Sequence, residues 1–101
     1  MAELLREALD EMTEAAAWYE ERREGLGERF LDIVQSTLRR IDDAPLTGAP
    51  WRQGKSRSVA VRRYPVPGFP FVVVYVTEPA LVVIAIAHTR RRAGYWRSRI
   101  G

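Results

Sequence analysis

The spacing of the apolar residues changes once along the chain, near Pro45, and this change limits the fold more than any other feature of the sequence. Before Pro45, apolar residues recur every third or fourth position, which is the pattern of one face of a helix. After it, short apolar runs alternate with proline and glycine, which is typical of strands joined by turns. A chain of 101 residues is long enough for one hydrophobic core. We therefore expect a single α+β domain, residues 1–101, with the helices first and the strands after them.

The first half predicts two helices, over about residues 7–24 and 28–42. The apolar stripe of the first consists of Ala8, Leu9, Met12, Ala15, Ala16 and Tyr19. The stripe of the second consists of Phe30, Ile33, Val34, Thr37, Leu38 and Ile41. Gly25-Leu26-Gly27 ends the first helix, because glycine tolerates the left-handed conformation of a C-terminal cap. A connection this short makes the two helices antiparallel neighbours.

The second half predicts a meander of three antiparallel strands over residues 58–64, 69–77 and 81–89, after a loop at residues 46–56. The last two strands are apolar almost throughout, which indicates that both faces of the sheet are at least partly covered. The helical hairpin can cover one face. Something else must cover the other face or bind to it.

Charge divides the chain at nearly the same place. Residues 1–51 hold 12 acidic and six basic side chains, a net charge of −6, whereas residues 52–101 hold one acidic and ten basic side chains, a net charge of +9. Such an asymmetry points to an anionic partner for the second half. The alternative is that the two halves neutralise each other within the fold, and both interpretations can hold in part.

Composition excludes several kinds of site. The chain has no cysteine for a disulfide, a thiol nucleophile or a zinc site, and its one histidine, His88, cannot form a histidine metal pair. The carboxylates lack the spacing of a calcium loop, so we predict no metal and no cofactor. The longest apolar run, residues 81–87, is too short to cross a membrane, and the N-terminus has no signal-peptide pattern. The expected location is the cytoplasm.

His88 is expected on one face of its strand together with Val82, Ile84 and Ile86, at the border of the sheet surface. A structural role is the first interpretation of this histidine, and a proton-transfer role is the second. A hydroxyl–histidine–carboxylate triad is disfavoured, because Thr89 points to the opposite face of the strand from His88.

Basic and aromatic residues gather in the second half. Two arginines lie on its first predicted strand, three follow its last strand, and Arg52, Lys55 and Arg57 lie in the loop that leads to the first strand. If the strands are neighbours, these guanidinium groups converge at one region of the sheet, where they can bind phosphate while an aromatic ring stacks on a base or on protein. The alternative is that the aromatic rings close the end of the core and the arginines are solvated flanks. The candidate target-binding or nucleic-acid-binding residues are Arg57, Arg62, Arg63, Arg90, Arg91, Arg92, Tyr95 and Trp96.

Two adjacent aromatic residues, Trp18 and Tyr19, lie on the first predicted helix. Tyr19 belongs to the apolar stripe and is expected to pack in the core, whereas Trp18 lies beside the stripe. Exposed aromatic residues at this place would instead meet a partner, so Trp18 and Tyr19 are the candidate partner-binding residues.

Several stretches of the sequence resemble the RelE/ParE superfamily of bacterial toxins, the plasmid-stabilisation proteins. Residues 7–20, which end in Trp18-Tyr19-Glu20, resemble the first helix of that family, and Gly25-Leu26-Gly27 with the stripe from Phe30 to Ile41 resembles its second helix. The stretches 61–64, 69–75 and 85–96 look like its three C-terminal strands and tail. The resemblance covers essentially the whole chain in order.

The resemblance implies a β-α-α-β-β-β architecture, with an antiparallel helical hairpin packed on one face of a twisted, mainly antiparallel sheet. Residues 2–5 would form a short N-terminal strand, although their local propensity would extend the first helix through them. The resemblance also implies a cognate antitoxin in a toxin–antitoxin hetero-oligomer. The C-terminal segment of such an antitoxin wraps the exposed surfaces of the toxin.

One branch of this family, the RelE-like toxins, cleaves mRNA in the ribosome with arginines and lysines on the sheet and a tyrosine in the C-terminal tail. If the chain resembles that branch, its catalytic residues would be Arg62, Arg63, His88, Arg90 and Tyr95. The sequence departs from the pattern in two ways. Thr89 occupies the position of an arginine at the end of the last strand, and Lys55 is the only lysine.

The other branch, the ParE-like toxins, inhibits DNA gyrase by binding it and has no enzymatic site of its own. The helical hairpin of this chain looks more like that branch. The leading hypothesis is therefore a ParE-like toxin directed at DNA gyrase, and the alternative is a RelE-like endoribonuclease that acts on the ribosome and its mRNA. A third possibility is a degenerate toxin that keeps the fold and the antitoxin but has lost its activity.

Overall fold

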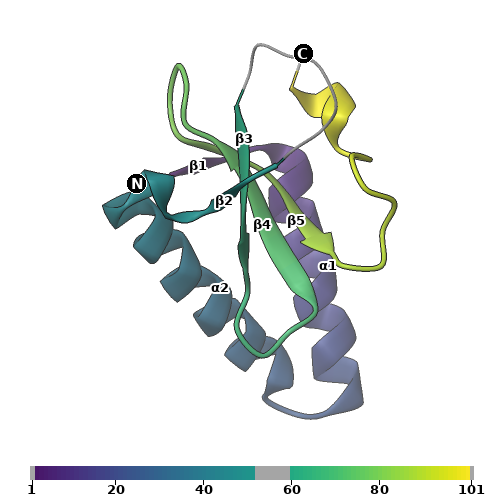
Figure 1. The fold of residues 1–101 in the computed structure, drawn as a ribbon. Coiled ribbons are helices and arrows are strands. Elements are labelled where there is room, and N and C mark those ends of the chain that lie inside the picture. The colour runs from purple at the N-terminus through teal and green to yellow at the C-terminus, as the bar shows by residue number, and fades with distance from the viewer. Residues whose placement is uncertain (1, 52–59, 101) are drawn as a thin grey trace.

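In the part of the chain that the structure describes, residues 2–51 and 60–100 of a computed structural model, two helices pack on one face of a five-stranded sheet (Figure 1). The elements in chain order are β1 (Glu3–Leu4), α1 (Arg6–Arg22), α2 (Leu26–Asp43), β2 (Ala49–Pro50), β3 (Val61–Pro65), β4 (Phe71–Val76) and β5 (Val82–His88). Two short 3₁₀ turns, η1 (Pro45–Thr47) and η2 (Arg97–Arg99), follow α2 and end the described chain. The predicted α+β fold is confirmed.

The strands lie in the order β1-β5-β4-β3-β2. β1 runs parallel to β5, with Glu3 opposite Val82, and the other neighbouring pairs are antiparallel. The predicted N-terminal strand is therefore confirmed against its helical propensity, because the Leu5 N–H bonds to the Val83 carbonyl at 3.0 Å and ties this segment to the sheet. β2 lies inside residues 46–56, which the sequence pattern predicts as loop.

Glu20, near the end of α1, binds the turn that joins the two helices of the hairpin. Gly25 has a left-handed φ of +87°, which agrees with the predicted glycine cap between α1 and α2. The Glu20 carboxylate accepts hydrogen bonds from the Gly25 and Gly27 N–H groups, both at 2.9 Å, so an α1 side chain caps the first turn of α2. These two hydrogen bonds lower the pKa of the Glu20 carboxyl.

The core between the helices and the sheet is built around aromatic rings. The Phe30 ring, which is fully buried, lies 5.3 Å from Tyr19, 5.0 Å from Phe69 and 5.2 Å from Phe71. Such edge-to-face and tilted contacts contribute beyond the area that they bury. The predicted stripe of α2 is buried or half-buried throughout. On α1, Leu9 departs from the prediction, because its side chain remains 45% exposed.

The other face of the sheet is closed by the end of the chain itself. Residues 95–100, the tail, fold back over this face, as the yellow segment beside β5 in Figure 1 shows. Gly94 makes the turn with a φ of +79°, and the Trp96 ring behind it is only 2% exposed. Val74, Ile84, Ala85 and Ala87 are buried in the same cluster as Trp96. The central part of this face is therefore covered by the tail and not by a partner, which agrees with the alternative that the aromatic rings close the end of the core.

A β-bulge changes which β5 residues share a face. Tyr75 pairs with Val83 but Val74 pairs with Ala85, so one extra β5 residue is accommodated at Ile84. Ile86 packs in the core on the helix side, whereas Ile84 packs in the cluster under the tail. The predicted single face holding Val82, Ile84, Ile86 and His88 is therefore wrong, because that alternation assumes a regular strand.

Candidate functional site

The Arg62 side chain is hydrogen-bonded to the backbone of the segment that follows α2. Its guanidinium donates to the Gly48 carbonyl at 2.7 Å and to the Leu46 carbonyl at 3.2 Å. The buried Tyr75, directly opposite Arg62 on β4, donates its hydroxyl to the Pro45 carbonyl at 2.7 Å and accepts from the Gly48 N–H at 2.9 Å. The two side chains together fix the segment after α2 against the sheet.

The predicted convergence of Arg62 with the arginines after β5 is wrong. Arg62 lies opposite Tyr75 on β4, whereas His88, the last residue of β5, lies opposite Phe71. These two positions on β4 are separated by four residues, about 13 Å along the strand. Arg62 and Arg63 are adjacent on β3, so their side chains also leave opposite faces of the sheet.

Arg63 instead lies on the face that the tail covers. Its guanidinium lies 5.2 Å from the centre of the Trp51 ring, and that ring contacts Trp96 edge-on at 5.1 Å. In the tail, the Arg91 guanidinium lies 3.8 Å above the Tyr95 ring. We call these five residues the tail face. Two cations are thus stacked on the aromatic residues of the tail face.

Further arginines surround the tail face. Arg90 and Arg92 are exposed in the turn that follows β5, where the Arg91 N–H donates to the His88 carbonyl and the Tyr95 N–H to the Arg92 carbonyl. Within residues 2–51 and 60–100, no carboxylate forms an ion pair with Arg63, Arg90, Arg91 or Arg92. This side of the molecule therefore carries guanidinium groups whose charge is available to a partner. Arg57, also predicted for this site, lies outside the described residues.

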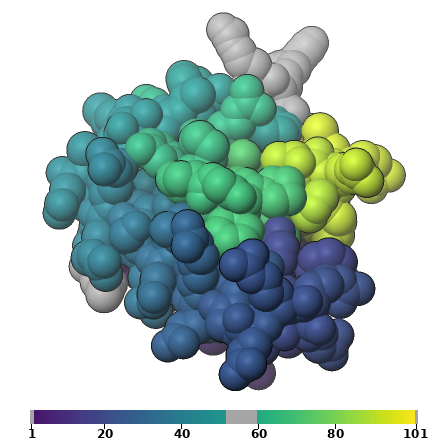
Figure 2. Space-filling model, turned by 90° about the horizontal axis from the view of Figure 1, so that it is seen from below, coloured from purple at the N-terminus to yellow at the C-terminus, as the bar shows by residue number. Residues whose placement is uncertain are grey.

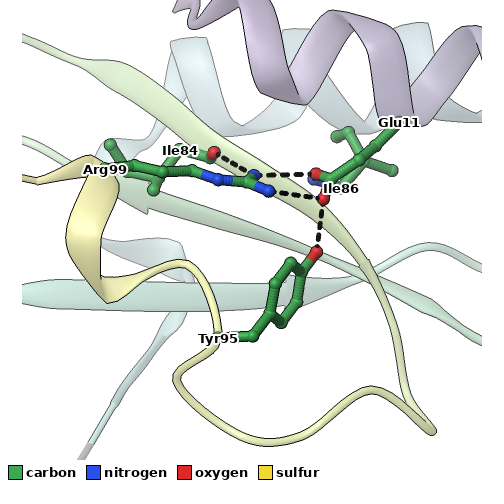
Figure 3. A network of polar contacts seen from close by, with 5 residues as sticks. All are labelled: Glu11, Ile84, Ile86, Tyr95 and Arg99. Atoms are coloured by element: carbon green, nitrogen blue, oxygen red, sulfur yellow. Dashed lines mark hydrogen bonds and ion pairs between the residues drawn. The ribbon is translucent and has the colours of Figure 1, made fainter.

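The tail is attached to α1 through one carboxylate, Glu11 (Figure 3). Tyr95 donates its hydroxyl to Glu11 Oε2 at 2.6 Å, and Arg99 forms two hydrogen bonds to the carboxylate, at 3.0 and 2.9 Å. The side chains of Arg99 and Glu11 are only 16% and 14% exposed. A bidentate guanidinium–carboxylate pair in such a position is both strong and directional.

The same pair also completes the edge of the sheet. β1 pairs with β5 only as far as Val83, so the β5 backbone beyond it has no neighbouring strand on that side. There Glu11 accepts from the Ile86 N–H at 3.0 Å and Arg99 donates to the Ile84 carbonyl at 3.1 Å. Two side chains thus satisfy backbone groups that a longer β1 would otherwise bind.

The environment of Tyr95 keeps its hydroxyl protonated. Burial, followed by the hydrogen bond to Glu11, raises the pKa of Tyr95 well above its ordinary value. The hydrogen bond to Glu11 raises the pKa of Arg99 as well, so this residue stays charged. Tyr95 is therefore a neutral hydrogen-bond donor whose hydroxyl proton points at Glu11, and it is poorly suited to act as a general base.

His88 is also engaged within the fold. Its ring packs edge-on against Phe71 with the centroids 5.0 Å apart, and its Nδ1 accepts a hydrogen bond from the Arg90 N–H at 3.0 Å. These contacts agree with the first interpretation of His88, a structural histidine. They also fix the direction in which the chain leaves β5.

The two aromatic residues predicted to meet a partner lie in different environments. The Tyr19 ring is half-buried in the aromatic core beside Phe30 and Phe69. Trp18 is 52% exposed, and the Arg22 guanidinium stacks 3.7 Å above its ring. Of these two residues, Trp18 presents a surface to solvent.

Sequence reasoning missed Glu11, Arg99 and Trp51. A signal for Glu11 exists in the helical spacing, because it follows Ala8 by three residues and precedes Ala15 by four, which places it on the buried stripe of α1. Nothing local marks Arg99, because its partner is 88 residues away in the sequence.

No group of His, Cys, Asp or Glu residues able to hold a metal ion occurs among residues 2–51 and 60–100. Over the same ranges, neither helix has the length and apolar character that a membrane span requires.

The space-filling view from below shows the yellow C-terminal part of the chain beside the green residues and next to α1 (Figure 2). Two comparisons with known proteins gave different results. A search of curated proteins found no match. The family model described as the ParE toxin of the type II toxin–antitoxin system parDE matches residues 2–93, which include both helices and all five described strands but stop short of the tail. The chain therefore belongs to the ParE toxin family of type II toxin–antitoxin systems.

Proposed function

We propose that this toxin arrests growth by binding DNA gyrase, without catalysing a reaction, and that a cognate antitoxin neutralises it in a hetero-oligomer. Membership of the ParE toxin family supports the role of toxin in a toxin–antitoxin pair. Because DNA gyrase acts on the bacterial chromosome, this target implies that the toxin works in the cytoplasm.

The observation that carries the non-enzymatic mechanism is the hydrogen bond from Tyr95 to Glu11, at 2.6 Å. A RelE-like reaction needs an available tyrosine in the tail and basic groups gathered around the phosphate that reacts. Here Tyr95 is held by Glu11, Arg62 by two backbone carbonyls, and His88 by the Arg90 N–H. Three of the five candidate catalytic residues thus have structural partners within the fold.

The tail face is the surface that best suits a target. The guanidinium groups of Arg63 and Arg91 lie 5.2 and 3.8 Å from the centres of aromatic rings, so each is positioned before a partner arrives. Oriented cations lose less conformational entropy on binding than mobile ones. The absence of paired carboxylates among the described residues around them favours a partner surface that is negatively charged.

The test uses the purified full-length protein in a gyrase supercoiling assay, with an mRNA-cleavage assay in a reconstituted translation system run in parallel. We expect supercoiling to be inhibited and the mRNA to stay intact. In cells, induction should give DNA breaks, filamentation and an SOS response, and an antitoxin encoded beside the toxin gene should relieve the arrest. Failure of the purified protein to inhibit supercoiling would contradict gyrase as the target, and the absence of growth arrest would contradict an active toxin.

One observation favours the RelE-like alternative. Arg90, Arg91 and Arg92 after β5 are exposed and form no ion pair with a carboxylate of residues 2–51 or 60–100, and guanidinium groups bind phosphate well. Rapid loss of mRNA after induction, abolished by Arg90→Gln with the tail network intact, would replace the gyrase proposal. The degenerate alternative predicts antitoxin binding with no growth arrest.

A further inference from the structure

The polar contacts between the tail and α1 converge on one side chain, Glu11. The Glu11 carboxylate accepts four hydrogen bonds, one from Ile86 in β5, one from Tyr95 and two from Arg99 (Figure 3). It thereby joins α1, the edge of β5 and the tail at one point. No carboxylate in residues 2–51 or 60–100 forms an ion pair with Arg63 or with the arginines of the turn after β5.

Apolar contacts alone would not fix the tail in one orientation. Trp96 and Ile100 bury apolar surface against the sheet, which favours a closed tail but is non-directional. The bidentate bond of Arg99 and the hydroxyl bond of Tyr95 are directional, so they select one position of the chain between these residues.

The exposed cations depend on that position. Arg91 stacks on the Tyr95 ring, whose hydroxyl Glu11 holds, and Arg99 approaches the same ring within 5.1 Å. Arg63 stacks on Trp51, which in turn packs against Trp96 of the tail. A displaced tail would therefore remove the ring beneath Arg91 and the support behind the Trp51 ring.

We propose that Glu11 is a positioning residue, which fixes residues 95–100 against α1 and β5 and thereby holds the arginines of the tail face in the arrangement that binds the target. The first part of this statement concerns the fold alone, and the second part rests on the proposed function. Glu11 lies within the region that matches the ParE family, whereas the tail lies beyond it.

The consequence of removing the charge follows from the burial of the pair. Glu11→Gln leaves the Arg99 guanidinium, which is 16% exposed, without its counter-ion in a poorly solvated place. The guanidinium recovers its hydration if it moves into water, and residues 95–100 move with it. The core between the helices and the sheet contains none of these groups and should keep its structure.

The experiment compares the full-length wild type, Glu11→Gln and the matched control Glu14→Gln, which changes an exposed carboxylate on the same helix. Hydrogen exchange read by mass spectrometry should be about ten- to a hundredfold faster in the peptide covering residues 95–100 of Glu11→Gln, with β4 unchanged. Glu14→Gln should match the wild type in both segments. Equal exchange of the tail in all three proteins would overturn the positioning role.

The second measurement is inhibition of purified gyrase by the same three proteins. We expect Glu11→Gln to need at least about a tenfold higher concentration, whereas Glu14→Gln inhibits like the wild type. A released tail combined with full inhibition would refute the link between tail position and target binding. If the wild type itself fails to inhibit gyrase, the proposed function fails and the second part fails with it, while the exchange data still decide the first part.

Should Glu11→Gln not fold, Tyr95→Phe provides the same comparison, because it removes the hydroxyl bond to Glu11 but keeps the ring under Arg91. Its tail should exchange faster than that of the wild type by a smaller factor, about threefold to tenfold. An unchanged tail in this variant would count against the proposal.

Discussion

The two faces of the sheet are closed by different kinds of interaction. On the helix side, α1 and α2 bury a continuous apolar core in which Phe30 contacts three other aromatic rings. On the other side, a six-residue tail closes the sheet with one buried tryptophan and a buried ion pair between Glu11 and Arg99. The first closure is distributed over many contacts, and the second depends on a few. Substitutions on the two sides should therefore differ in how much they lower the free energy of unfolding. They should also differ in which segment they detach from the sheet.

The helix side should show the largest effect. Phe30→Ala removes the ring at the centre of the aromatic cluster and leaves a cavity between α2 and the sheet. We expect the free energy of unfolding to fall by about 3–5 kcal/mol, and urea unfolding followed by circular dichroism measures it. A loss below about 1 kcal/mol would mean that the helices are not the principal support of the sheet.

A substitution on the tail side should lower the free energy of unfolding less than Phe30→Ala does, but it should expose more of the apolar face of the sheet. Trp96→Ala removes the ring that covers Val74 and Ile84, and we expect a loss of about 2–3 kcal/mol, because the tail can move away rather than leave a closed cavity. The dye ANS, which binds exposed apolar surface, should bind folded Trp96→Ala. It should not bind Phe30→Ala under conditions in which the same fraction of each variant is folded. Absence of dye binding would show that the tail does not cover this face.

The contrast between the two faces of the sheet also explains which parts of the fold could be predicted from the sequence. The helices follow from periodicity and the last two strands from their apolar runs, because these apolar residues, with Leu9 as an exception, meet the core whatever their exact partners. β1 was predicted by resemblance alone, since its two residues form a strand only when β5 lies beside them. The closing of the core by Tyr95 and Trp96 was predicted only as an alternative, and it is confirmed. The bulge at Ile84, the role of Arg62 and the bonds between the tail and Glu11 could not be predicted. Each depends on groups that are distant in sequence, such as Arg62 and the Leu46 carbonyl 16 residues before it.

The stabilisation that Glu20 provides at the turn between α1 and α2 should depend on pH. Hydrogen bonds from Gly25 and Gly27 hold the pKa of Glu20 below its ordinary value of 4.5, so the unfolded chain takes up a proton at this residue more readily than the folded one. The stabilisation from Glu20 is therefore complete above about pH 4.5 and disappears as the pH falls through the lowered value. Thermal unfolding should show Glu20→Gln less stable than the wild type at pH 7, and the difference should shrink as the pH falls below 4.5. A gap that stays constant with pH would exclude this role.

Trp18 should show the smallest effect on stability. It is 52% exposed and its main contact is the Arg22 guanidinium, so Trp18→Ala should cost about 0.5 kcal/mol. If this residue meets the antitoxin, the variant should still arrest growth but be relieved less well by co-expressed antitoxin. Full relief of the arrest would remove Trp18 from the partner-binding surface.

The difference between the two faces depends on the coupling between Glu11 and Arg99, and a double-mutant cycle measures that coupling directly. The free energies of unfolding of the wild type, Glu11→Gln, Arg99→Gln and the double variant should give an interaction energy of about 2–3 kcal/mol, as expected for a buried, charged, bidentate pair. Additive effects of the two substitutions, with an interaction energy below about 0.5 kcal/mol, would contradict the account in which this ion pair closes the second face of the sheet.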